Sequence, residues 1–156
     1  MKFNEFYSLT IVHSRDIILV KGVDYMNITK QKSQKTFDKQ AADYDTNIQG
    51  EHARKLYKPI IENLKNKNIH SILDLGCGTG ALLKEIKELN IAEQLFGIDI
   101  SPNMLEIAKN KLGNDATLIL GDSERLPFED SSFDAIVCND SFHHYPQPDI
   151  VEKEVS

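Results

Sequence analysis

The spacing of hydrophobic residues divides the chain into a helical N-terminal part and a later part in which short apolar runs alternate with helices. Phe37, Ala41 and Tyr44 recur at the spacing of one helical face. A second helix is expected over residues 51–66. Pro59 lies inside this second helix and predicts a kink or a break at the residue before it, because proline cannot donate the helical hydrogen bond.

Downstream of these helices, the apolar runs become short and continuous. Strands are predicted for HSILDL, QLFGIDI, ATLILGD and FDAIVCND, and helices for GALLKEIKELN and SPNMLEIAKNKLG. Ser101, Pro102 and Gly113 suit the N-cap, the first position and the end of the second of these helices. Continuous apolar strands that alternate with helices indicate an α/β fold with a doubly wound parallel sheet, covered on both faces.

The two ends of the chain depart from this alternation. Residues 1–25 contain two aliphatic runs around a polar centre, which form either a hairpin or nothing ordered. We interpret them as an extension outside a domain that spans residues 26–156. A helix has only begun at PDIVEKEVS when the sequence stops, so we expect a sheet truncated after its fourth strand. That strand would keep an unpaired edge, which predicts a homodimer through the edge.

Composition and charge narrow the class of function. The 156 residues are 40% hydrophobic and 27% charged, as in one ordinary globular domain. A net charge of −6 disfavours a nucleic-acid partner. No apolar stretch approaches the ~20 residues of a membrane span. The two cysteines form no disulfide framework and indicate free thiols in a cytoplasmic protein.

Polar residues gather where the predicted strands end. Ligands of an open parallel sheet bind outside the carboxyl ends of its strands, so these residues are expected to share one crevice. In chain order they are Gly76, Gly78 and Gly80 after the first strand, Asp99 at the end of the second, Asp122 after the third, and Asn139 and Asp140 at the end of the fourth.

Two of these acids suit a nucleoside. Asp99 lies about twenty residues after the glycine turn, where an acid can accept both ribose hydroxyls; the alternative is a surface acid that ends a strand. Asp122 can accept a hydrogen bond from an adenine amino group, beside the backbone of Ser123. It is equally suited to cap the turn before Glu124.

The glycine turn leaves two ligand classes open. GCGTGA fits the loose dinucleotide-binding pattern, which makes a nicotinamide-dependent oxidoreductase one alternative. Asp74, two residues before the first glycine, would repel a pyrophosphate, whereas it suits an ammonium group beside a sulfonium. A nucleoside joined to a zwitterionic amino acid describes S-adenosylmethionine.

The motifs together resemble those of a known family. ILDLGCGTG, GIDISPNMLEIAK and GDSERLPFEDSSFDAIVCNDSFHHY are similar to successive motifs of class I S-adenosylmethionine-dependent methyltransferases. The branch with the ubiquinone and menaquinone biosynthesis methyltransferases is the most similar. The resemblance covers about residues 30–156 and implies a Rossmann-like sheet of seven strands, of which this chain supplies the first four.

The resemblance also implies a role for individual residues. Asp74 and the turn from Gly76 to Gly80 would hold the methionine part of the cofactor, and Tyr44 would close over it. The implied cofactor-binding residues are Tyr44, Asp74, Gly76, Cys77, Gly78, Gly80, Asp99, Ile100, Met104, Asp122, Ser123 and Asn139.

The methyl acceptor is expected to be a small molecule. NDSFHHY departs from the run that nucleic-acid amino-methyltransferases carry at this place. His143 and His144 follow the fourth strand and are either a general base or loop residues that line the acceptor pocket. No structural zinc spacing is present, so no metal site is predicted. A third alternative is a non-catalytic fragment that only binds the cofactor.

Overall fold

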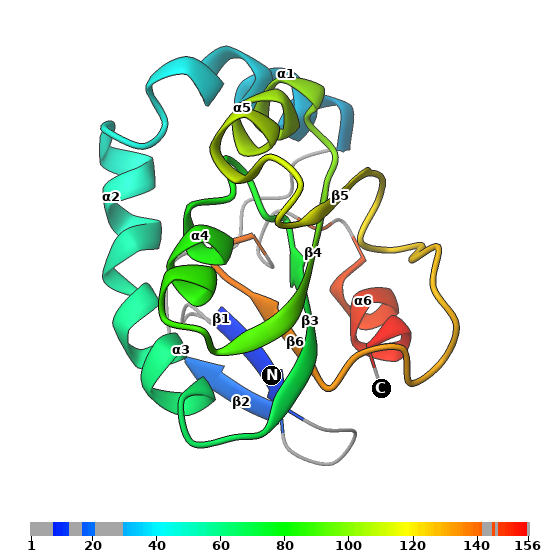
Figure 1. The fold of residues 1–156 in the computed structure, drawn as a ribbon. Helices are drawn as coiled ribbons and strands as arrows, with labels where there is room; N and C mark the ends of the chain where they lie inside the picture. Colours follow the sequence, from blue (N-terminus) through cyan, green and yellow to red (C-terminus); the bar gives the residue numbers. More distant parts are fainter. Residues whose placement is uncertain (1–7, 13–16, 21–29, 142–144, 146, 156) are drawn as a thin grey trace.

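The computed structural model describes residues 8–12, 17–20, 30–141, 145 and 147–155. Figure 1 colours the chain from blue at the N-terminus to red at the C-terminus. The elements are β1 (Ser8–Val12), β2 (Ile17–Val20), α1 (Lys30–Gln40), η1 (Ala41–Asp43), α2 (Ile48–Lys55), α3 (Tyr57–Leu64), β3 (Ile69–Leu75), α4 (Ala81–Glu88), β4 (Ala92–Asp99), α5 (Pro102–Leu112), β5 (Thr117–Leu120), β6 (Ala135–Cys138) and α6 (Pro148–Glu154).

Four strands form the parallel sheet that the sequence predicts. Their order is β6-β3-β4-β5, and Leu73 of β3 lies opposite Phe96 of β4 and Ile136 of β6. Every residue of the central strand β3 except His70 is buried. Because the four strands run in the same direction, their carboxyl ends lie at one edge of the sheet.

Helices and loops cover both faces of this sheet, as a doubly wound fold requires. On one face α3, α4 and α5 pack around Ile72, and on the other α6 packs around Leu73 with a group of aromatic residues. Within that group, Phe133 meets Phe96 and Phe128 edge to face, with ring centroids 5.0 and 4.8 Å apart. Figure 1 shows α6 on the side of the sheet opposite to α4.

The outer edge of β6 is paired, which corrects the expectation of an open edge. β1 pairs antiparallel with β6, with Thr10 opposite Val137, and β2 pairs antiparallel with β1. The sheet therefore has six strands in the order β2-β1-β6-β3-β4-β5. The hairpin alternative for the N-terminal segment is confirmed, and a homodimer through an exposed β6 edge loses its structural reason. The domain boundary at residue 26 stays a prediction.

The predicted helical face is present in α1 and η1, where the rings of Phe37 and Tyr44 meet edge to face at 6.3 Å. The predicted helix over residues 51–66 is divided, but at Leu56 rather than at Lys58. Pro59 thereby falls in the first turn of α3, where its missing N–H has no helical partner to lose. Residues 30–46, which comprise α1, η1 and the loop after them, are called the cap below.

Candidate ligand-binding site

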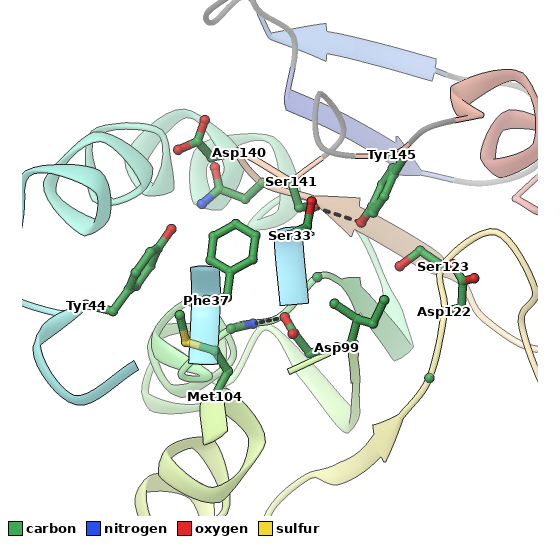
Figure 2. A pocket seen from close by; sticks show the side chains of 15 residues that line it. Ser33, Phe37, Tyr44, Asp99, Met104, Asp122, Ser123, Asp140, Ser141 and Tyr145 are labelled. Carbon is green, nitrogen blue, oxygen red and sulfur yellow. Dashed lines mark hydrogen bonds between the residues drawn. The ribbon is translucent and has the colours of Figure 1, made fainter. Parts of the chain in front are cut away.

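A cavity of about 70 Å³ lies between the cap and the carboxyl ends of the parallel strands. Residues that end or follow β3, β4, β5 and β6 line it, and α1 contributes the opposite wall. Figure 2 places Asp122 and Ser123 at one end of the cavity, Asp140 and Tyr44 at the other, and Phe37 between them. The strand ends thus converge on one site, as the sequence predicts.

The glycine turn after β3 brings bare backbone to this cavity. Gly76 and Gly78 have φ angles of 69° and 53°, which residues with side chains rarely adopt. A Cβ atom at Gly76 would also lie 2.5 Å from the Cβ of Ser141. The N–H of Gly76 donates to the carbonyl of Ile98, and the N–H of Gly78 donates to the carboxylate of Asp99, both at 2.8 Å. These bonds fix the turn to the end of β4.

Asp99 is held through both of its carboxylate oxygens. Oδ2 accepts the Gly78 N–H, and Oδ1 accepts the N–H of Ser101 at 2.8 Å. The residue is 8% exposed, and burial raises its pKa although these N–H groups act in the opposite direction. A carboxylate oxygen has two lone pairs, so the oriented group can still accept hydrogen bonds from a diol in the cavity.

Asp74 lies behind the glycine turn and is 2% exposed. Its Oδ1 atom has no hydrogen-bond partner among the described residues. Burial raises the pKa of this carboxyl group well above the ordinary value, and the Asp99 carboxylate adds to the effect. A buried polar atom without a partner is costly, so Asp74 is suited to a ligand group that donates a hydrogen bond or carries positive charge.

Nine of the twelve predicted binding residues line the cavity. Of the other three, Asp74 lies behind the turn, Cys77 is in the core next to Gly97, and Gly80 packs against α5. The predicted His143 and His144 lie outside the described residues. Those that line the cavity are Tyr44, Gly76, Gly78, Asp99, Ile100, Met104, Asp122, Ser123 and Asn139.

Two of these lining residues also have a structural role. Asp122 Oδ1 accepts the N–H of Glu124 at 3.0 Å, so the turn-capping alternative for Asp122 is confirmed. The Asn139 side chain donates to the carbonyl of Ala53 at 3.2 Å and thereby connects the end of β6 to α2. Both side chains are consequently fixed before any ligand arrives.

Sequence reasoning missed several residues of the cavity wall. Ser33 of α1 is 5% exposed, and its Oγ has no partner among the described residues. Its spacing of four from Phe37 was the available signal, because both then share one helical face. Ser141 donates to the carbonyl of Leu75 at 2.8 Å and lies 3.0 Å from the Tyr145 hydroxyl oxygen. No sequence pattern pointed to these last two residues.

Polar side chains attach the cap at two points. The Ser101 hydroxyl donates to Asp38 at 2.6 Å. The Thr79 hydroxyl and the Lys111 ammonium donate to Asp45 at 2.5 and 2.8 Å. Burial acts to raise the pKa of Asp45, but the hydrogen bonds from Lys111 and Thr79 outweigh it and lower the pKa.

The surroundings of Tyr44 determine the protonation state of its phenol and the packing of its backbone against α2. Burial raises the pKa of its phenol well above the ordinary value, with further contributions from the Asp140 and Asp99 carboxylates, so the side chain stays a neutral O–H donor. Behind it, a Cβ atom at Gly50 of α2 would overlap the carbonyl oxygen of Tyr44. The glycine at the start of α2 therefore lets the cap pack closely against that helix.

Other kinds of site receive no support from the described part of the chain. Within it, no group of three or more His, Cys, Asp or Glu side chains could hold a metal ion. The described helices include none that is long and apolar enough to cross a membrane. Cys77 and Cys138 are both buried and free.

Fold and site together define a doubly wound α/β domain with a cavity at its strand ends that is lined by carboxylates and by a glycine turn. The family described as "Methyltransferase domain" matches residues 72–154, which extend from within β3 to the end of α6. The chain belongs to the class I S-adenosylmethionine-dependent methyltransferase family. The resemblance inferred from the motifs is thereby confirmed.

Two of the curated relatives that the chain resembles are methyltransferases of different substrates. The demethylmenaquinone methyltransferase of Thermotoga maritima is 34% identical over 120 residues, which are 75% of this chain and 52% of the relative. The malonyl-[acyl-carrier protein] O-methyltransferase of Priestia megaterium is 34% identical over 121 residues, or 76% of this chain and 43% of the relative. The chain thus spans about half the length of the curated relatives it matches.

A solved structure supports the fold. The crystal structure of the [4+2]-cyclase SpnF superimposes on this chain with a TM-score of 0.66 at 21% sequence identity. The superimposed part comprises 82% of this chain and 55% of the SpnF chain. At that identity the likeness concerns architecture alone. It is consistent with the doubly wound sheet predicted from the apolar runs.

Proposed function

We propose that this chain binds S-adenosylmethionine in the cavity and transfers its methyl group to a small-molecule acceptor. The observation that carries the proposal is the convergence of nine predicted binding residues on one cavity at the strand ends. The family to which the chain belongs supports the same cofactor.

The residues divide along the length of the cofactor. Asp99 takes the two ribose hydroxyls, between the backbone of Ile100 and the side chain of Met104. Asp122 and Ser123 meet the adenine at the end of the cavity that Figure 2 shows beside them. The ring is thereby held by groups that the fold already orients.

The methionine part lies over the glycine turn. Ser33 Oγ in the cavity wall and Asp74 Oδ1 behind the turn have no hydrogen-bond partner among the described residues, and we assign them as an additional donor and acceptor for this part of the cofactor. Gly76 and Gly78 permit close approach of the backbone, and Asn139 borders the same space. The residues present therefore fit a zwitterionic amino-acid group.

The cap must move when the ligand enters. Drug-sized ligands occupy pockets of roughly 300–1,000 Å³. The cavity of about 70 Å³ is much smaller, and Phe37 of α1 projects into its middle. Displacement of α1 would open the space and its return would exclude water from the reacting groups.

The protein's contribution to methyl transfer is alignment. When bound, the cofactor supplies a methyl group that its sulfonium already activates. The oriented carboxylate of Asp99, the rigid turn at Gly76 and the cap would hold the reactants in line and keep water out. A base is needed only where the acceptor must lose a proton. His143 and His144 stay predictions for that role.

Two further properties remain proposals. The free buried thiols of Cys77 and Cys138 support a cytoplasmic location. The net charge of −6 supports a small molecule over a nucleic acid as acceptor.

Calorimetric titration with S-adenosylhomocysteine tests the proposal. The chain is expected to bind it with micromolar affinity, and Asp99→Ala is expected to abolish the heat of binding, since Asp99 both contacts the ribose and fixes the turn. Binding without any methyl transfer would support the alternative of a non-catalytic fragment. Binding of a nicotinamide dinucleotide, together with no response to S-adenosylhomocysteine, would overturn the proposal in favour of the oxidoreductase.

A further inference from the structure

Asp140 and His52 form a pair at the end of the cavity farthest from Asp122 and Ser123. Asp140 Oδ2 lies 3.3 Å from His52 Nδ1. The Asp140 side chain is 13% exposed and lines the cavity, whereas the His52 side chain is 40% exposed and comes from α2. An acidic residue of the cavity wall is therefore joined through an imidazole to the solvent side of the protein.

The backbone conformation at Asp140 and a neighbouring hydrogen bond hold this pair in place. Asp140 has a φ angle of 55°, a left-handed conformation that only Gly, Asn and Asp adopt readily. The preceding residue, Asn139, donates to the carbonyl of Ala53, which directly follows His52 in α2. Two consecutive residues after β6 thus contact two consecutive residues of α2. This two-point contact fixes the direction of the Asp140 carboxylate.

The pair of Asp140 and His52 lies at the end of the site where we expect the methyl acceptor to bind. In the proposed function the nucleoside lies at Asp99 and Asp122, and the methionine part lies over the glycine turn. The opposite end, which Figure 2 shows between Asp140 and Tyr44, is then where an acceptor approaches the methyl group. The ring of Tyr44 borders this end, and the ring of Phe37 meets it edge to face from the middle of the cavity, so both rings offer apolar surface to a flat aromatic acceptor (Figure 2).

We propose that Asp140 receives the proton of an aromatic hydroxyl acceptor and that His52 positions Asp140 and passes the proton to solvent. This inference rests on the proposed function. The hydroxyl oxygen bonds to the methyl carbon, the carbon–sulfur bond breaks with its electron pair on sulfur, and the hydroxyl proton moves to the Asp140 carboxylate. The products are a methyl ether and S-adenosylhomocysteine. The oxygen becomes more acidic as its new bond forms, so a carboxylate can accept the proton.

The charges around the cavity favour a neutral acceptor. Asp99, Asp122 and Asp140 line it, and the described lining residues include no Lys or Arg. A carboxylate acceptor would approach Asp140 against like charge in a partly buried site. A hydroxyl acceptor meets no such repulsion and gains a hydrogen bond to the same group.

Two probes of equal ring size separate these acceptor classes. Protein saturated with S-adenosylhomocysteine is titrated with 2-naphthol and with 2-naphthoate. We expect 2-naphthol to bind at least tenfold more tightly, and Asp140→Asn to remove the difference by improving the binding of 2-naphthoate. Asn tolerates the left-handed backbone at this position, so the variant should fold. Asp130→Asn makes the same change of charge in an exposed loop and should keep the preference of the parent.

Transfer of a labelled methyl group from S-adenosylmethionine to 2-naphthol then tests the proton path. Asp140→Asn should lower the rate at least 100-fold with unchanged affinity for S-adenosylhomocysteine. His52→Ala should lower the rate about tenfold, and added imidazole should restore it, which a purely structural role would not allow.

Several outcomes would overturn the inference. They are equal or tighter binding of 2-naphthoate by the parent, binding of neither probe, no transfer to 2-naphthol, and an Asp140→Asn variant that keeps the preference or the rate. Absence of S-adenosylhomocysteine binding is a separate result, observed before a probe is added. It would reject the proposed function, and the inference would fall with it.

Discussion

The two sides of the cavity hold their carboxylates in opposite ways. On the side of the glycine turn, Asp74 and Asp99 are buried and burial raises the pKa of each. In the cap, hydrogen bonds from Lys111 and Thr79 outweigh burial and lower the pKa of Asp45. Ionised carboxylates near the turn therefore cost stability at neutral pH, whereas the one in the cap contributes to it. The side of the glycine turn thus keeps carboxylates that suit a ligand but lower the stability of the ligand-free protein.

The two sides also differ in what fixes them. Backbone N–H groups of Gly78 and Ser101 hold Asp99, and such bonds move only if the turn itself rearranges. The cap is attached through the side chains of Asp38 and Asp45, which can exchange their partners for water. The cap is thus the part that can open for a ligand larger than the present cavity.

Gly50→Ala is the change expected to disturb the cap most. The new Cβ would overlap the carbonyl oxygen of Tyr44, so either α2 or the cap must shift. We expect a loss of about 1–3 kcal/mol in the free energy of unfolding, as for other overpacked sites. Urea denaturation measures this loss. Gln49→Ala, an exposed position in the same helix, is the control and should unfold like the parent. A Gly50→Ala variant as stable as this control would contradict the packing described.

Asp74→Asn tests the opposite side. The raised pKa means that the native state binds this proton more tightly than the unfolded state does. The stability that the group contributes is therefore complete below its ordinary pKa of 3.8 and is lost as pH rises through the higher native pKa. An amide cannot ionise, so the variant should be more stable than the parent at neutral pH, by about 1–3 kcal/mol. The gain should shrink as pH falls.

Thermal unfolding between pH 4.5 and 7.5 measures the effect, with S-adenosylhomocysteine titration beside it. The variant should bind the ligand at least tenfold more weakly while its own melting temperature rises. Asp134→Asn is a control of opposite sign, because N–H groups of Ser71 and His70 lower the pKa of Asp134. That variant should be destabilised at neutral pH. A destabilised Asp74→Asn protein would reject our account of the buried charge.

The turn side was readable from sequence because its bonds are either local or join the ends of neighbouring parallel strands. The N-cap of α5 was predicted, and the Ser101 hydroxyl accepts the N–H of Met104 at 3.2 Å. Asp99 and the glycine turn lie about twenty residues apart and follow adjacent strands, so a general rule for parallel sheets brings them together. Spacing and residue type were sufficient there.

The cap and the acceptor end were not readable in the same way. His52 contacts Asp140 across 88 positions, and Ser101 contacts Asp38 across 63. No periodicity specifies which residues meet over such separations. The pairing of β1 with β6 was missed for the same reason, since it joins the first described strand to the last. Packing in three dimensions decides these contacts.

Ser33→Ala sharpens the comparison at the boundary between the two sides. If the orphaned hydroxyl meets the amino-acid part of the cofactor, its loss should weaken S-adenosylhomocysteine binding by about 1 kcal/mol, or roughly fivefold. Binding of 5′-methylthioadenosine, which lacks the amino-acid part, should be unchanged. Calorimetry with both ligands makes this comparison. Equal weakening of both would move Ser33 to the nucleoside, and no weakening of either would remove it from the site.

The smallest effect is expected where Lys111 holds the cap. Lys111→Met removes the ammonium from Asp45, and an ion pair that is still partly open to solvent contributes only about 0–1 kcal/mol. Because the pKa of Asp45 is lowered, its contribution is present above the ordinary pKa and lost as pH falls through the lower native value. The variant should therefore differ from the parent in stability at neutral pH and match it in acid.

Limited proteolysis should cut the cap of the Lys111→Met variant faster than that of the parent. Lys109→Met, which replaces an exposed lysine on the same helix, should be cut at the rate of the parent. If both variants resist the protease like the parent, the Lys111 ammonium does not control opening, and the bond from Thr79 to Asp45 and the contacts of Asp38 with Ser101 and Asn103 are sufficient to hold the cap.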